Sequence, residues 1–298
     1  MAKARAIVKR RKSVRNIKKI THTMQLIATA RFQKALQRAV ATQPYTRKIT
    51  ELVAQLSAAG VTIDNKLLKV NSGANCTAML VITSNRGLCG GYNASILRTA
   101  MAHMERTSAA GVTTDLSVVG KKGIAYFKFL NRPLTHAYPK MSDTPQFAEV
   151  EPIANGFIEA YANQTYDSIY VTYMRFISAA RQAPTVIELL PIREEAKPSE
   201  AGESAAPAGP QAEVQYDFSP DPKTLLDELL PLTVKVRLFQ CFCDATVSEQ
   251  VARMTAMKSA TDAAGDMIKQ LSRQYNRARQ SQITMELLDI LGGVEALK

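Results

Sequence analysis

The chain has 298 residues, and its 46% hydrophobic and 21% charged residues are the proportions of a folded protein, which excludes wholesale disorder. No apolar run of about 18 residues is present, so a membrane-spanning helix is excluded, and four cysteines and three histidines at unrelated spacings form no recognisable zinc site. The net charge of +12 is uneven, because residues 1–50 contain 14 Lys and Arg and no acidic residue, whereas the other residues hold 24 basic and 26 acidic ones.

The first predicted element is a long helix from about Ala4 to Ala59, which Pro44 can kink and Gly60 ends. Its apolar positions recur at steps of three and four, the spacing of a coiled-coil stripe. Because this stripe runs through the basic start of the chain, we interpret the start as mature protein and not as a signal or transit peptide. The apolar positions are Ile7, Val14, Ile17, Ile20, Met24, Ile27, Phe32, Leu36 and Val40.

The middle of the chain, residues 75–192, alternates between short β-branched runs and helical segments. This order predicts a three-layer, Rossmann-like α/β domain with a mostly parallel sheet. The predicted strands are 76–83, 116–120, 168–173 and 184–190, and the predicted helices are 93–106, 123–130 and 151–163.

A segment rich in Ala, Pro, Gly, Glu and Ser, residues 193–219, follows and predicts a flexible linker. After it, Asp221 is a plausible N-cap and Pro222 a first helical residue. The last segment, 220–298, again steps by threes and fours, and about 60 helical residues make a rod of about 90 Å. Such a rod is too long for a compact domain. Its apolar or small positions are Leu229, Leu232, Val236, Phe239, Cys243, Val247, Val251, Met254, Met257, Thr261, Ala264, Ile268, Leu271, Tyr275 and Ala278.

Two long amphipathic segments at opposite ends of one chain bury their stripes most simply against each other. We therefore predict an antiparallel coiled coil made of an N-terminal arm, 1–60, and a C-terminal arm, 220–298, with the α/β domain inserted between them. The sequence GLCGGYN (87–93) lies between a predicted strand and a helix, but it lacks the lysine of a phosphate-binding loop. No nucleophile with a base can be recognised from spacing, so we do not expect the chain to be an enzyme.

Several blocks of the sequence resemble the gamma subunit of the F-type rotary ATP synthase, in the same order and across nearly the whole length. The C-terminal block carries the pattern Ile-Thr-x-Glu with a carboxylate three residues on and then Gly, although Val294 replaces a preferred alanine. The resembling blocks are KKITHTMQLIATARF (18–32), SNRGLCGGYN (84–93), ARQAPTVIELLPI (180–192), PDPKTLLDELL (220–230), VARMTAMKSATDAAGDMI (251–268) and ITMELLDILGGVEAL (283–297).

The resemblance implies a rotor shaft without catalytic residues, cofactor or metal. Its coiled coil would stand inside a head of alpha and beta subunits, and its α/β domain, with the epsilon subunit, on the membrane ring of c subunits. Rotation would then drive the catalytic beta subunits through their conformations. The implied location is the cytoplasmic face of the bacterial inner membrane, as a peripheral subunit.

The resemblance also assigns contact residues. For the alpha and beta head these are Arg279, Gln280, Thr284 and Glu286 near the C-terminal tip, Met24 on the first arm, and the basic residues Lys9, Arg10, Arg11, Lys12, Arg15, Lys18 and Lys19. Tyr216 and Phe218 match aromatic contacts with the c ring and epsilon subunit, while Ser219 stands where relatives carry a carboxylate.

The last fifteen residues are apolar on nearly every face of a helix, which suits a tip enclosed by a sleeve of other proteins. The alternative is a tip that packs on its own α/β domain. A second function stays open from the residues alone: a basic coiled coil that binds nucleic acid, since a helix with 14 basic and no acidic residues can follow phosphates. The absence of interleaved aromatic residues and of a known binding module counts against it.

Overall fold

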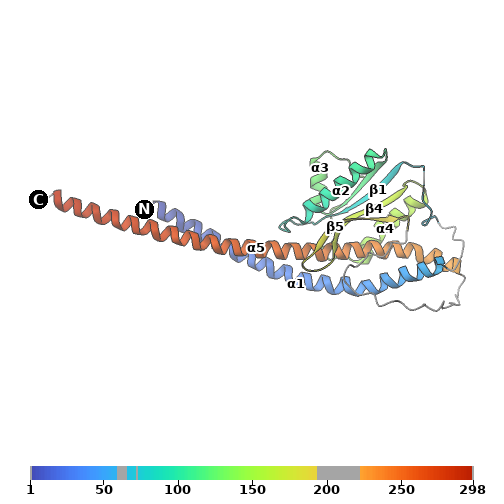
Figure 1. The fold of residues 1–298 in the computed structure, drawn as a ribbon, viewed down its shortest axis with the longest axis horizontal. Helices are drawn as coiled ribbons and strands as arrows, with labels where there is room; N and C mark the ends of the chain where they lie inside the picture. The colour runs from blue at the N-terminus through green and yellow to red at the C-terminus, as the bar shows by residue number, and fades with distance from the viewer. Residues whose placement is uncertain (1, 59–65, 72, 193–221, 297–298) are drawn as a thin grey trace, which may run out of the picture. The chain divides into compact units, whose positions relative to one another are not determined.

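A computed structural model describes residues 2–58, 66–71, 73–192 and 222–296. These residues form two compact units. Unit 1 contains Met1–Gln33, Leu88–Gly90 and Gln250–Lys298, and unit 2 contains Lys34–Gly87 and Gly91–Glu249. The two terminal helices each contribute residues to both units (Figure 1).

The two terminal helices are α1 (Ala2–Ala58) and α5 (Pro222–Ala296), with 57 and 75 residues. Both continue through prolines, Pro44 in α1 and Pro231 in α5. A proline removes one helical hydrogen bond, and Pro44 lies at an exposed position of α1.

Unit 2 is built on a five-stranded sheet with the order β3-β2-β1-β4-β5. Neighbouring strands are parallel from β3 to β4, and β5 runs antiparallel at the edge, so the predicted mostly parallel sheet is confirmed. The strands are β1 (Cys76–Ile82), β2 (Thr113–Val119), β3 (His136–Tyr138), β4 (Ser168–Phe176) and β5 (Gln182–Leu190), and the helices between them are α2 (Tyr92–Ala109), α3 (Lys121–Phe129) and α4 (Phe147–Ala162).

Helices cover both faces of this sheet: α2 and α3 lie on one, and α4 with residues 222–249 of α5 on the other (Figure 1). Successive strand residues point to opposite faces, and six of the seven residues of β1 are buried, which is the pattern of a strand covered on both sides. Leu230, Val234 and Leu238 of α5 are buried in the same core as Leu80 of β1 and Phe157 of α4. The start of the C-terminal helix therefore forms part of the α/β core.

In unit 1, α1 and α5 pack side by side and antiparallel (Figure 1). Residues later in α1 contact residues earlier in α5. The guanidinium of Arg11 lies 5.2 Å from the ring centre of Tyr275, whereas Thr21 meets Thr261 through hydroxyl oxygens 2.8 Å apart. Val14 is buried between Ala264 and Leu271. The antiparallel coiled coil predicted from the two stripes is confirmed.

The stripe predicted on α1 is wrong in detail. Ile17, Ile20, Ile27 and Val40 are 50–57% exposed. Ile7, Val14, Phe32 and Leu36 of the predicted stripe are buried or half-buried, but the other buried or half-buried positions are polar or small, so a search for apolar side chains did not select them. Between residues 5 and 42 these other positions are Arg11, Thr21, Gln25, Ala28, Thr29, Ala35, Ala39 and Thr42. The stripe predicted on α5 is confirmed, since all its positions are buried or half-buried.

Candidate functional site

The predicted contact residues of the first arm lie on the outside of the helical pair in unit 1. Lys9 and Arg10 are exposed, but Arg11 is half-buried because its side chain stacks on Tyr275. The remaining basic residues of the cluster, Lys12, Arg15, Lys18 and Lys19, are exposed as well. The N-terminal part of α1 therefore presents a band of positive charge with no acidic residue of its own.

Met24 lies in an exposed apolar line. It is 37% exposed, and Ile17, Ile20 and Ile27 on the same helix are more exposed still. These four residues are three or four positions apart, so they share one face of α1 that does not face α5. This surface was not predicted, because the same spacing was interpreted as the seam with α5.

The contact residues of the second arm follow one another along α5. Tyr275, under the Arg11 guanidinium, lies about one helical turn before Arg279. Arg279 and Gln280 are exposed, and the Thr284 hydroxyl donates a hydrogen bond of 3.0 Å to the carbonyl oxygen of Gln280. Glu286 accepts a hydrogen bond of 2.8 Å from the Gln282 amide. These polar groups alternate with the first side chains of the apolar tip.

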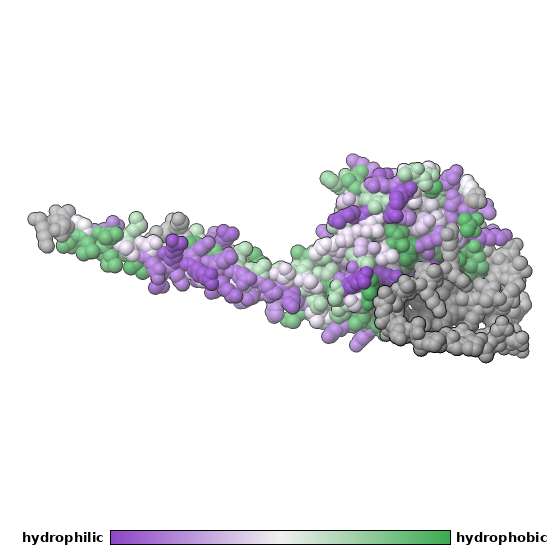
Figure 2. Space-filling model, in the orientation of Figure 1, coloured by the Kyte–Doolittle hydropathy of each residue, from purple (hydrophilic) through white to green (hydrophobic). Residues whose placement is uncertain are grey.

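The tip of α5 is exposed and apolar. Its large side chains are 45–68% exposed, as isolated water-soluble helices seldom are. Figure 2 shows this end of α5 as mainly hydrophobic, next to a strongly hydrophilic stretch. The residues are Ile283, Met285, Leu287, Leu288, Ile290, Leu291 and Val294.

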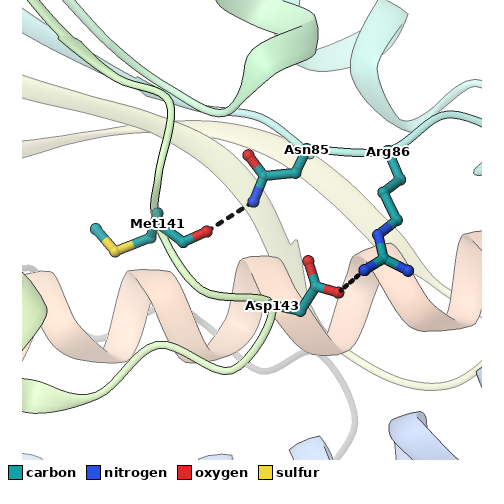
Figure 3. Close-up of polar contacts among 4 residues, drawn as sticks. All are labelled: Asn85, Arg86, Met141 and Asp143. Carbon is teal, nitrogen blue, oxygen red and sulfur yellow. Dashed lines mark hydrogen bonds and ion pairs between the residues drawn. The ribbon is translucent and has the colours of Figure 1, made fainter.

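The sequence GLCGGYN lies at the carboxyl end of β1, where open α/β sheets bind ligands. In unit 2 this region is filled by the chain itself. The Asn85 side-chain amide donates to the Met141 carbonyl oxygen at 2.7 Å, and Arg86 pairs with Asp143 at 3.1 Å (Figure 3). The cavity beside them has about 30 Å³, room for about one water molecule.

Two glycines of the next strand-to-helix turn, Gly120 and Gly123, lie too close to Thr83 to carry a side chain. A side chain at Gly120 would meet the Thr83 carbonyl oxygen at 2.2 Å, and one at Gly123 would meet the Thr83 hydroxyl at 2.6 Å. The glycines therefore serve close packing of α3 on β1. Among the described residues, no group of three His, Cys, Asp or Glu side chains is placed to hold a metal ion.

A half-buried polar cluster joins α1 to α5 in unit 2. The Thr42 hydroxyl donates to the Gln240 side-chain oxygen at 2.8 Å, and the Gln240 amide donates to Asp244 at 2.9 Å. Burial raises the pKa of Asp244 to about 6, although Gln240 and Arg175 oppose this change. Burial likewise raises the pKa of the Cys243 thiol to about 11, so it stays protonated and unreactive at neutral pH.

Tyr216 and Phe218 lie outside the described residues. The predicted head-contact residues of both arms thus lie on unit 1, and the predicted ring contacts lie outside the described residues.

Comparison with known proteins gives one consistent result. The family model described as ATP synthase matches residues 3–297. The ATP synthase gamma chain of Rhodopirellula baltica is 48% identical over 300 residues, and that of Leptospira biflexa is 40% identical over 297 residues, each covering 100% of both chains. Neither result supports the nucleic-acid-binding alternative.

Solved structures share the fold. A chain of the Euglena gracilis mitochondrial ATP synthase rotor superposes with a TM-score of 0.63 and 17% identity, covering 95% of this chain and 99% of that one. A chain from the Tetrahymena thermophila central stalk and c ring gives a TM-score of 0.57 and 19% identity, covering 81% and 99%.

Proposed function

The chain belongs to the ATP synthase gamma chain family, and from this premise we propose that it is the central rotor shaft of a proton-translocating F-type ATP synthase. It couples rotation of the membrane c ring to the conformational cycle of the catalytic beta subunits. It is a non-catalytic subunit of that enzyme. Residues 1–60 and 220–298 act as the two arms of the shaft, 75–192 as its α/β domain, and 193–219 as a linker.

The observation that carries this proposal is the exposed apolar end of α5. Seven large apolar side chains between Ile283 and Val294 are at least 45% exposed, a surface that water disfavours and that a surrounding apolar sleeve would bury. Because the apolar side chains lie on all sides of the helix, such a sleeve holds the tip without fixing one angle. We assign the sleeve to the alpha and beta subunits.

Polar and basic positions supply contacts that depend on angle. Arg279 and Gln280 are exposed at the base of the tip, and the planar guanidinium of an arginine can bind a carboxylate through two parallel hydrogen bonds. The basic band at Lys9 and Arg10 attracts acidic loops of the head. The exposed apolar residues Ile17, Ile20, Met24 and Ile27 lie on one face of α1 only, so the shaft presents different surfaces on different sides. A shaft that acts on several catalytic sites in turn needs such asymmetry.

A separate part of the chain contacts the membrane sector. We assign Tyr216 and Phe218 to contacts with the c ring and the epsilon subunit, and the cytoplasmic face of the bacterial inner membrane to the protein. In the described part of the chain, no helix is both long and apolar enough to cross a bilayer.

The double substitution Arg279→Glu with Gln280→Ala tests the proposal. Both side chains are exposed, so thermal unfolding of the isolated chain should shift by no more than about 0.5 kcal/mol. Proton-driven ATP synthesis by membranes containing the assembled enzyme should fall severalfold. The control is Arg273→Glu with Gln274→Ala, an equally exposed pair that lies earlier on α5. Equal losses of synthesis in the two variants would contradict the assignment.

A further inference from the structure

A second basic region lies in unit 2. Residues 116–142 contain Lys121, Lys122, Lys128, Arg132 and Lys140 and no acidic residue, although the chain after residue 50 has a slight excess of acids. All five side chains are exposed, and none of them forms an ion pair within the described residues. The charge is therefore available to a partner outside this chain.

Aromatic and aliphatic side chains stand among these cations on α3. Phe129 is 83% exposed, more than any other large hydrophobic residue of the described chain, and Tyr126 and Leu130 are 37% and 39% exposed. Lys122, Tyr126 and Phe129 follow helical spacing along one line, with Lys121 and Lys128 on the next. Green and purple surfaces mix over the part of unit 2 where α3 lies (Figure 2).

The helix that carries this patch is held rigidly from behind. Phe127 is fully buried and Ile124 is 8% exposed, and Gly123 packs closely on Thr83. The aromatic and basic side chains therefore point outward because the other face of α3 is fixed in the core. Their exposure is a property of the folded unit and not of a loose segment.

We propose that this α3 patch, made of Lys121, Lys122, Tyr126, Lys128, Phe129 and Leu130, binds the surface of an anionic phospholipid bilayer. Cationic side chains are attracted to acidic headgroups, and an exposed Phe and Leu can enter the boundary between headgroups and acyl chains. Phe129 is 83% exposed and protrudes from the folded unit. A bilayer needs no surface of complementary shape to receive such a side chain, whereas the binding core of a protein interface does.

The absence of tryptophan from the chain gives a direct test. Phe129→Trp places a single reporter in the patch, and Ile20→Trp places one among the basic residues of α1, at a position that is 57% exposed. Each full-length variant is mixed with vesicles of phosphatidylcholine and phosphatidylglycerol, with and without brominated acyl chains. We expect a blue shift and bromine quenching at position 129, and only electrostatic adsorption without quenching at position 20.

The charge contribution is measured in the Phe129→Trp background. Lys121→Gln and Lys128→Gln should each lower the vesicle partition coefficient about fivefold. Neutral phosphatidylcholine vesicles should give no blue shift. The proposal is overturned if the indole at position 129 keeps its water-exposed emission with acidic vesicles, or if quenching is equal at positions 129 and 20. A blue shift with polyglutamate but not with vesicles overturns it in favour of an acidic protein.

Discussion

Replacing Asp244 by asparagine removes a carboxyl group from the polar cluster between α1 and α5 in unit 2. The group faces Gln240 and Cys243 on its own helix and Tyr173 and Arg175 on β4. Asparagine has the same shape and still offers a side-chain oxygen to the Gln240 amide, so the substitution changes the charge and keeps the packing.

The size and sign of the effect follow from the pKa of Asp244. Burial raises it from 3.8 to about 6, a difference worth at most about 3 kcal/mol. Because the folded protein holds the proton more tightly, the stability that this group contributes is complete below about pH 4 and is lost as the pH rises through about 6. At neutral pH the wild type should be the less stable protein, and Asp244→Asn should restore up to that amount.

The assay is urea unfolding of the isolated chain between pH 4 and 8, followed by circular dichroism. The control is Asp266→Asn, which removes an exposed carboxylate that pairs with Lys269 and should change stability by about 0.5 kcal/mol or less. A loss of stability in Asp244→Asn at neutral pH, or an advantage over the wild type that is the same at pH 4 and pH 8, would show that burial does not raise the pKa of Asp244.

Other predictions concern packing and the helical pair. Gly123→Ala should destabilise unit 2 by about 1–3 kcal/mol, because the new methyl group would clash with Thr83. Gly156→Ala, in open space on α4, should stabilise unit 2 by up to about 1 kcal/mol. Thermal melts of both variants measure these changes, and equal melting temperatures would contradict the difference. Leu238→Ala should cost about 2–5 kcal/mol in urea unfolding, since this residue is fully buried, and a cost below about 1 kcal/mol would contradict its place in the sheet core. Thr261→Val should lower stability by about 1 kcal/mol through loss of the hydrogen bond to α1, measured by the same unfolding curves, and an unchanged curve would argue against that contact.

Periodicity predicted the existence of the long helices and most strands because these elements have many residues and strong patterns. The strand β3 was missed, since its three residues, His136 to Tyr138, are too few to form a pattern. The stripe on α5 was predicted correctly, and in unit 1 its predicted partner α1 is confirmed. The packing of α5 on the sheet was not predicted. Apolar residues at helical spacing suit a sheet as well as a second helix, so Leu230 and Leu238, which lie outside the predicted stripe, do not reveal that they pack on strands.

The seam on α1 was misplaced for a related reason. Contact with α5 is made by residues such as Arg11 and Thr21, which a search for apolar side chains ignores. The guanidinium of Arg11 lies over the Tyr275 ring, and the Thr261 hydroxyl donates a hydrogen bond to the Thr21 hydroxyl, so polar residues can occupy a seam. The half-buried carboxyl of Asp244 could not be predicted, because its sequence neighbours resemble those of any other helical turn.

In the working enzyme, we expect other proteins to enclose the apolar end of α5. Labelling of Leu288→Cys with a maleimide measures this enclosure, with the unsubstituted chain as the background for the native cysteines. We predict rapid labelling of the isolated chain, where this side chain is 61% exposed, and strong protection after assembly with the alpha and beta subunits. Equal labelling rates in the isolated chain and in the assembled enzyme would contradict it.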